Sequence, residues 1–183
     1  MYNNIIKLII LTVLILPFQN YNSQMIKSEL NPDGNNFNQV RIENIDKVFL
    51  LKGNENSIII ETNSDKYKLI DFKIVDGIAF IKAEHKNEEE VNYNIYITSK
   101  SDEIFINGFN IGAFRTKDKV YFKAIKLKIF NCAKIDLLVA TQSLFCDIQN
   151  VFSFKIAGHT DKMTLQKKNV MVNNLRKLNI STN

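Results

Sequence analysis

Tryptophan is absent from the 183 residues of the chain, and proline, cysteine and histidine occur only twice each. The two histidines, His85 and His159, share no motif, and neither has a cysteine at ligand spacing, so no zinc site is predicted. The six glycines form no phosphate-binding pattern, and no base accompanies Ser143 or Ser153. The sequence therefore predicts no metal, no cofactor and no catalytic residue.

The two cysteines leave two states open. Cys132 and Cys146 are able to pair in an oxidising compartment, but they occupy different places in the repeat described below. If they stay reduced, Cys146 is an ordinary buried thiol. No cysteine lies near residue 23, so a lipoprotein anchor is not expected.

Long apolar runs are missing except at the N-terminus, which resembles a secretory signal. Lys7 precedes an apolar run over residues 8–18 that is broken only by Thr12 and Pro17. Eleven residues are too few to span a bilayer as a helix. We expect a signal peptide over residues 1–23, a flexible leader over 24–38 and one domain over 39–183, with an uncleaved anchor as the alternative. Both place the domain in the periplasm, at the outer membrane surface or outside the cell.

The composition favours a folded β domain. Hydrophobic residues make up 45% of the chain and include 13 phenylalanines, which excludes a disordered protein. Apolar residues alternate around residues 40–50, 58–60 and 93–97, and Asp76-Gly77 between two apolar runs predicts a hairpin. All-β structure is therefore predicted.

The charge is unevenly distributed along the chain. Residues 25–114 contain 10 basic and 15 acidic side chains, whereas residues 115–183 contain 13 and 4. The basic half favours an anionic partner such as a glycan, or another envelope protein; nucleic acid is not expected for an exported chain. Solvation of exposed strands by lysine explains the same pattern.

A repeat of 19 residues carries the fold prediction. Asn131, Asn150 and Asn169 recur at this spacing, and six apolar positions recur with them. We place Gly108 in the same column as an earlier copy, which gives a spacing of 23 and a short insertion at residues 121–123. Three of these apolar columns are Ile125, Leu144 and Met163; Leu127, Cys146 and Leu165; and Leu137, Ile156 and Leu175.

Such a repeat predicts a β-solenoid, in which equivalent residues of successive coils stack about 4.8 Å apart. Asparagine and glycine tolerate a left-handed backbone, so the column of Gly108, Asn131, Asn150 and Asn169 suits a corner where stacked amides bond to one another. The last copy carries Lys167 and Asn173 in apolar columns, which is typical of a cap.

Several short motifs resemble the head GIN domain family of autotransporter adhesins, a bacterial domain of unknown function. They are residues 107–111 (Asn-Gly-Phe-Asn-Ile), 131–133 (Asn-Cys-Ala), 150–153 (Asn-Val-Phe-Ser), 48–53 and 75–81. The resemblance covers residues 40–183 and implies a right-handed single-stranded β-helix, a role at the cell surface or envelope, and no catalytic residues.

The alternative function is a carbohydrate-active β-helix enzyme, a lyase or a glycoside hydrolase. Paired catalytic carboxylates must lie about 5 to 9.5 Å apart. Asp136 and Asp147 are expected on different sides of the coil, each sharing a column with a lysine. We therefore predict a non-enzymatic binding or structural module. Its candidate binding residues are Lys126, Lys128, Lys134 and Lys155.

Overall fold

The computed structural model describes residues 25–62, 69–84 and 92–181. The described chain is all β and contains no α-helix. The predicted signal peptide and His85 lie outside the described residues. The strands are β1 (Ile26–Glu29), β2 (Gln39–Lys52), β3 (Ser57–Thr62), β4 (Ile70–Val75), β5 (Ile78–Ala83), β6 (Tyr93–Ser99), β7 (Glu103–Thr116) and β8 (Val120–Ile180).

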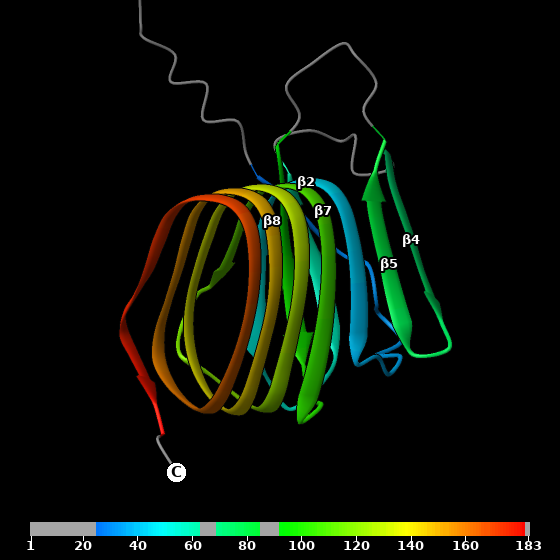
Figure 1. Cartoon of the computed structure of the whole chain (residues 1–183). Coiled ribbons are helices and arrows are strands. Elements are labelled where there is room, and N and C mark those ends of the chain that lie inside the picture. Colours follow the sequence, from blue (N-terminus) through cyan, green and yellow to red (C-terminus); the bar gives the residue numbers. More distant parts are fainter. Residues whose placement is uncertain (1–24, 63–68, 85–91, 182–183) are drawn as a thin grey trace, which may run out of the picture.

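The long strands β2, β7 and β8 form one curled sheet. β7 runs parallel to β2 along one side and parallel to the first coil of β8 along the other. Figure 1 shows β8 as a ribbon that winds through successive coils beside β7. We call one such circuit of the chain a coil. Within the described ranges no helix has the length and apolarity to cross a bilayer.

The alternating apolar pattern builds the core. Along β2, Val40, Ile42, Ile45, Val48 and Leu50 are all buried. Every second side chain of a strand points to the same face, and this alternation is interrupted around the corner at Asn44, where the backbone is left-handed. The predicted apolar columns behave in the same way in the inner coils. Ile125, Leu127, Leu137, Leu144, Cys146 and Ile156 are buried, whereas Met163, Leu165 and Leu175 are partly buried.

Antiparallel strands cover the N-terminal end of the coils. β5 pairs in parallel with the first part of β2, and β6 pairs in parallel with its last part. β4 then pairs antiparallel with β5, and β3 pairs antiparallel with β6. The predicted hairpin is confirmed: β4 and β5 meet through a two-residue turn in which Asp76 (φ 50°) and Gly77 (φ 74°) are both left-handed. This geometry is that of a type I′ turn, which matches the twist of the flanking strands.

A column of five asparagines marks one corner of every coil. Asn44, Asn110, Asn131, Asn150 and Asn169 have φ values between 53° and 60°. Each amide nitrogen from Asn110 onward donates to the amide oxygen of the preceding coil, at 3.1, 3.1, 3.0 and 2.8 Å in chain order. We call this column the Asn ladder.

The assignment of Gly108 to that corner is wrong. Gly108 pairs with Ile129, is buried and does not have a positive φ. The corner residue is Asn110, which lies beside Asn131. The offset between these coils is therefore 21 residues, and the two extra residues fall between the end of β7 at Thr116 and the start of β8 at Val120.

Both cysteines are buried and unpaired. Cys132 donates a hydrogen bond to the Lys134 carbonyl (3.3 Å), and Cys146 lies in the core. Burial raises the pKa of Cys132 to about 11 and that of Cys146 to about 12. Both are therefore neutral thiols at physiological pH and have a packing role.

A carboxylate cluster ties the N-terminal strands together. Glu61 of β3 accepts hydrogen bonds from Tyr96 (2.8 Å) and Asn94 (3.4 Å) of β6 and pairs with Lys27 of β1 (3.2 Å). The Tyr96 hydroxyl is the main cause that lowers the pKa of Glu61, and Lys27 and Asn94 add to it against the opposing effect of burial. The ionised form of Glu61 is therefore the form that stabilises the fold.

We expect Tyr96→Phe to lower the free energy of unfolding by about 1 to 2 kcal/mol at neutral pH, because it removes a hydrogen bond to a charged group. The ring that stacks on Phe49 is retained. Because the folded pKa of Glu61 is lowered, its contribution is complete above the ordinary carboxyl pKa and disappears as the pH falls through the folded pKa. Urea unfolding at neutral and acid pH measures this. The free energies of unfolding of the wild type and of Tyr96→Phe should become equal at acid pH. The control Tyr121→Phe, on an exposed ring, should lose no stability at either pH.

Candidate binding face

One outward face of the coils gathers phenylalanine and lysine side chains. The parallel register places Phe105 of β7 beside Lys126 of β8, and Phe109 beside Phe130. Phe145 follows on the next coil, 19 residues after Lys126, which is the spacing that the Asn ladder fixes. All these residues precede the Asn corner and alternate with buried ones, so they project outward together. We call Phe105, Phe109, Lys126, Lys128, Phe130 and Phe145 the aromatic-basic face.

Lys126 lies between two aromatic rings. Its Nζ atom is 4.9 Å from the ring centroid of Phe105 and 5.5 Å from that of Phe145. Such cation-π contacts at exposed sites contribute about 0.5 to 1 kcal/mol each. They favour this position of the ammonium group and do not neutralise its charge.

Phe109 and Phe130 form a stacked pair on the same two strands, four residues further along than Phe105 and Lys126. Their ring centroids are 5.4 Å apart and the planes differ by 2°. The two residues are 41% and 38% exposed, which is high for phenylalanine. The pair therefore presents a flat apolar surface to solvent on the same strands as Lys126 and Lys128.

The charges on this face are open to a ligand. Among the residues that the structure describes, neither Lys126 nor Lys128 makes an ion pair. Asp147, one coil beyond Lys128, accepts a hydrogen bond from Gln149 (3.3 Å). A shallow groove of about 360 Å³ runs along Gln39, Phe105, Lys126 and Phe145.

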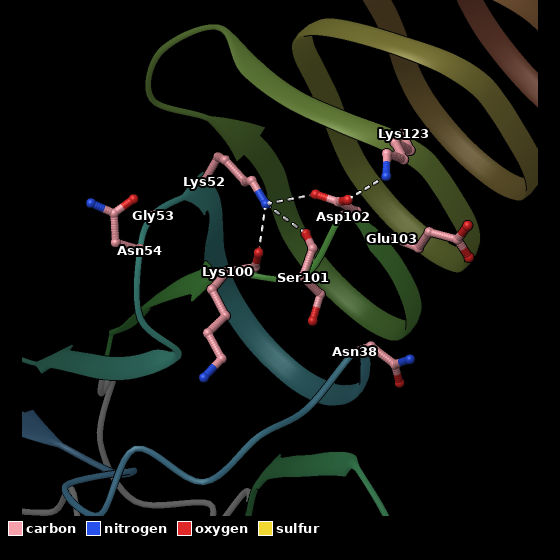
Figure 2. A pocket seen from close by; sticks show the side chains of 9 residues that line it. All are labelled: Asn38, Lys52, Gly53, Asn54, Lys100, Ser101, Asp102, Glu103 and Lys123. Atoms are coloured by element: carbon pink, nitrogen blue, oxygen red, sulfur yellow. Dashed lines mark hydrogen bonds and ion pairs between the residues drawn. The ribbon is translucent and has the colours of Figure 1, made fainter.

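A larger open pocket of about 870 Å³ adjoins this groove and shares Asn38 and Glu103 with it. Figure 2 shows Lys52 reaching across it from β2. Its Nζ atom donates to the carbonyls of Lys100 and Ser101, both at 2.7 Å, and lies 3.9 Å from Asp102. Lys52 thus fastens the connection between β6 and β7.

Another lysine that lines this pocket, Lys123, forms an ion pair. Lys123 lies 2.7 Å from Asp102, and this hydrogen bond lowers the pKa of Asp102 and raises that of Lys123 (Figure 2). Both groups are therefore charged at neutral pH, and neither is poised to exchange a proton with a substrate. The Lys123–Asp102 ion pair and the hydrogen bonds of Lys52 therefore connect the segments that line this pocket.

The structure separates the four predicted lysines into two pairs. Lys126 and Lys128 lie on the aromatic-basic face, before the Asn corner. Lys134 and Lys155 follow the corner, and both pair with Asp136, each at 3.4 Å. The second pair is therefore engaged in structural contacts on another side of the coil.

Comparison with known proteins identifies the family. Residues 36–182 match the family model described as "Putative auto-transporter adhesin, head GIN domain". The chain belongs to the head GIN domain family. No match was found among curated proteins.

Solved structures share the fold of this head GIN domain. A putative lipid binding protein from Parabacteroides distasonis ATCC 8503 has 13% sequence identity and a TM-score of 0.57, with 87% of this chain and 76% of that chain covered. A putative adhesin from the same strain has 8% identity and a TM-score of 0.53, with 78% and 69% covered. At such low identity these similarities establish the fold only.

Asp136 and Asp147, the two carboxylates considered for an enzyme, both make other contacts. Asp136 lies between Lys134 and Lys155, and Asp147 is bonded to Gln149 on the other side of the Asn corner. His159 contacts Asp161 at 3.1 Å on the surface. Within residues 25–62, 69–84 and 92–181, no group of three or more His, Cys, Asp or Glu side chains is placed to hold a metal ion.

Sequence reasoning missed Phe109 and Phe130. Each directly precedes an asparagine of the Asn ladder, so the repeated Phe-Asn pair is a signal in the sequence. Placing Gly108 at the corner shifted the first coil by two residues and hid the match. With Asn110 at the corner, the two rings fall beside one another.

Proposed function

We propose that the protein is an exported, non-enzymatic binding module that folds as a right-handed β-solenoid and binds an extended anionic glycan of the cell envelope on the aromatic-basic face. The observation that carries this proposal is the exposed Phe109–Phe130 stack on the same strands as Lys126 and Lys128, which form no ion pair with a carboxylate among the described residues. Export is supported by the pattern of residues 1–23.

A polyuronate, which is a chain of acidic sugars, matches both the phenylalanine rings and the lysines of the aromatic-basic face. The C–H face of a sugar ring is apolar and packs on an exposed aromatic surface, which is how aromatic side chains contribute contact area at low entropic cost. The carboxylate of the next sugar pairs with Lys126 or Lys128. Phe130, Lys128 and Lys126 follow one another at every second position along one strand, about 6.6 Å apart, so an extended chain that runs along this strand meets the stack and both lysines in turn.

The test compares two lysine pairs that change the net charge equally. Binding of polygalacturonate is measured by calorimetry at about 0.15 M salt, where long-range attraction is screened, with uncharged dextran as the comparison polymer. We expect Lys126→Gln/Lys128→Gln, and separately Phe109→Ala/Phe130→Ala, to weaken binding about tenfold. Lys134→Gln/Lys155→Gln should change it less than twofold, because these side chains lie on another side.

Two outcomes would overturn the proposal. An equal loss with both lysine pairs would show that polygalacturonate responds only to the net charge of the basic half. Unchanged binding in the variants of the face would place the site elsewhere. Circular dichroism of each variant confirms that the fold is retained.

A further inference from the structure

The outermost described coil, residues 161–180, leaves a sheet edge open. Figure 1 shows this coil at the end of the stack farthest from the β4–β5 hairpin. Within the described part of the chain, no strand pairs with its outer side. An unpaired edge offers rows of backbone N–H and C=O groups to another strand.

Apolar side chains behind this edge are only half covered. Met163, Leu165, Val170, Leu175 and Leu178 pack on the core but stay partly exposed, unlike the buried Leu144 and Ile156 one coil earlier. Beside them Met171 is 76% exposed and Val172 48%. Covering such a row with one more coil would remove apolar surface from water.

The Asn ladder is closed at one end and open at the other. At the N-terminal end Asn44 donates to the Ala83 carbonyl of β5. At the other end Asn169 donates inward to Asn150, and no described group donates to the Asn169 amide oxygen. That oxygen is positioned to accept a hydrogen bond from an amide on a further coil, as every earlier rung does.

The outermost coil is also strongly basic. Residues 161–180 contain five basic side chains and one acidic side chain. Lys167 occupies the column that holds Ile129 and Ile148 in the inner coils, and it is exposed. An occupant that stacks on this coil therefore places a side chain directly over a lysine.

We propose that this edge binds an acidic segment of a partner polypeptide, which adds to the sheet as a further coil. A second copy of the chain is disfavoured, since two such edges bring like charges together, and at the other end of the coils β2 is already paired with β5 and β6. A bilayer is disfavoured because hydrocarbon does not satisfy the edge N–H and C=O groups. A polypeptide strand satisfies them and covers the apolar row.

The probe is a synthetic peptide with the sequence of residues 143–161, which already has its apolar residues and Asn150 in the correct columns. It carries Cys146→Val and Lys155→Glu, and either Ile148→Glu or Ile148→Lys, so that one charged residue falls over Lys167. We expect the Ile148→Glu peptide to bind roughly fivefold more tightly than the Ile148→Lys peptide, as one surface ion pair against one repulsion allows. Fluorescence anisotropy of the labelled peptides measures this.

A charge reversal decides the register. Lys167→Glu in the protein should invert the preference between the two peptides, whereas Lys117→Glu/Lys119→Glu, in the loop between β7 and β8, should leave it unchanged. Absence of peptide binding up to about 1 mM would overturn the proposal. So would self-association of the chain that Lys167→Glu strengthens, or binding of anionic vesicles that excludes the peptide.

Discussion

Gly158→Ala should destabilise the coils by about 3 kcal/mol or more, the largest effect that we expect of a single methyl group in this chain. Gly158 has φ 110°, a backbone conformation that residues with a Cβ atom rarely adopt. A Cβ atom at this position would also collide with the carbonyl oxygen of Val139 on the preceding coil. Because the obstacle is backbone, no rotation of a side chain relieves it, and the two coils must move apart.

Urea unfolding followed by circular dichroism measures this loss, and Gly34→Ala is the matched control. Gly34 also has a positive φ (62°), but nothing lies within 4 Å of its added Cβ. It should cost only the left-handed penalty of about 1 kcal/mol. If the two variants unfold at the same urea concentration, the close approach of the coils at Gly158 is not what requires glycine there.

Asn131→Ala should cost about 2 kcal/mol, the second largest effect. Asn131 donates to Asn110 and accepts from Asn150, so its removal interrupts the Asn ladder at its centre. Each exposed amide bond contributes about 0.5 kcal/mol, and alanine at φ 57° adds about 1 kcal/mol of strain.

Asn131→Gly separates the two causes, because glycine adopts the same φ without strain but makes neither hydrogen bond. We expect it to cost about 1 kcal/mol, half the effect of alanine. Asn179→Ala, on an exposed asparagine outside the Asn ladder, should change the free energy by less than about 0.5 kcal/mol. Equal losses for Asn131→Ala and Asn131→Gly would show that the left-handed backbone does not matter at this corner.

The positions of the strands follow from local pattern. Alternation over residues 40–50 and the Asp76-Gly77 turn predict β2 and the β4–β5 hairpin, because side-chain period and turn geometry are properties of neighbouring residues. The head GIN domain resemblance rested on such short motifs as well, and the match over residues 36–182 confirms it. The aromatic-basic face could be predicted only in part, since Lys126 and Lys128 were named without the phenylalanine rings of the same face.

The order of the residues alone predicts β structure and shows that Asn131, Asn150 and Asn169 recur with their apolar neighbours, because a constant 19-residue spacing needs no tertiary information. The placing of Asn110, rather than Gly108, beside Asn131 could be found only from the three-dimensional arrangement of the coils. The connection between Thr116 and Val120 absorbs two extra residues, and a loop length does not state which residues lie beside one another. Side-by-side placement is a property of packed coils. For the same reason, the packing of the coils places Lys126 between two phenylalanine rings, whereas Lys134 and Lys155 pair with Asp136.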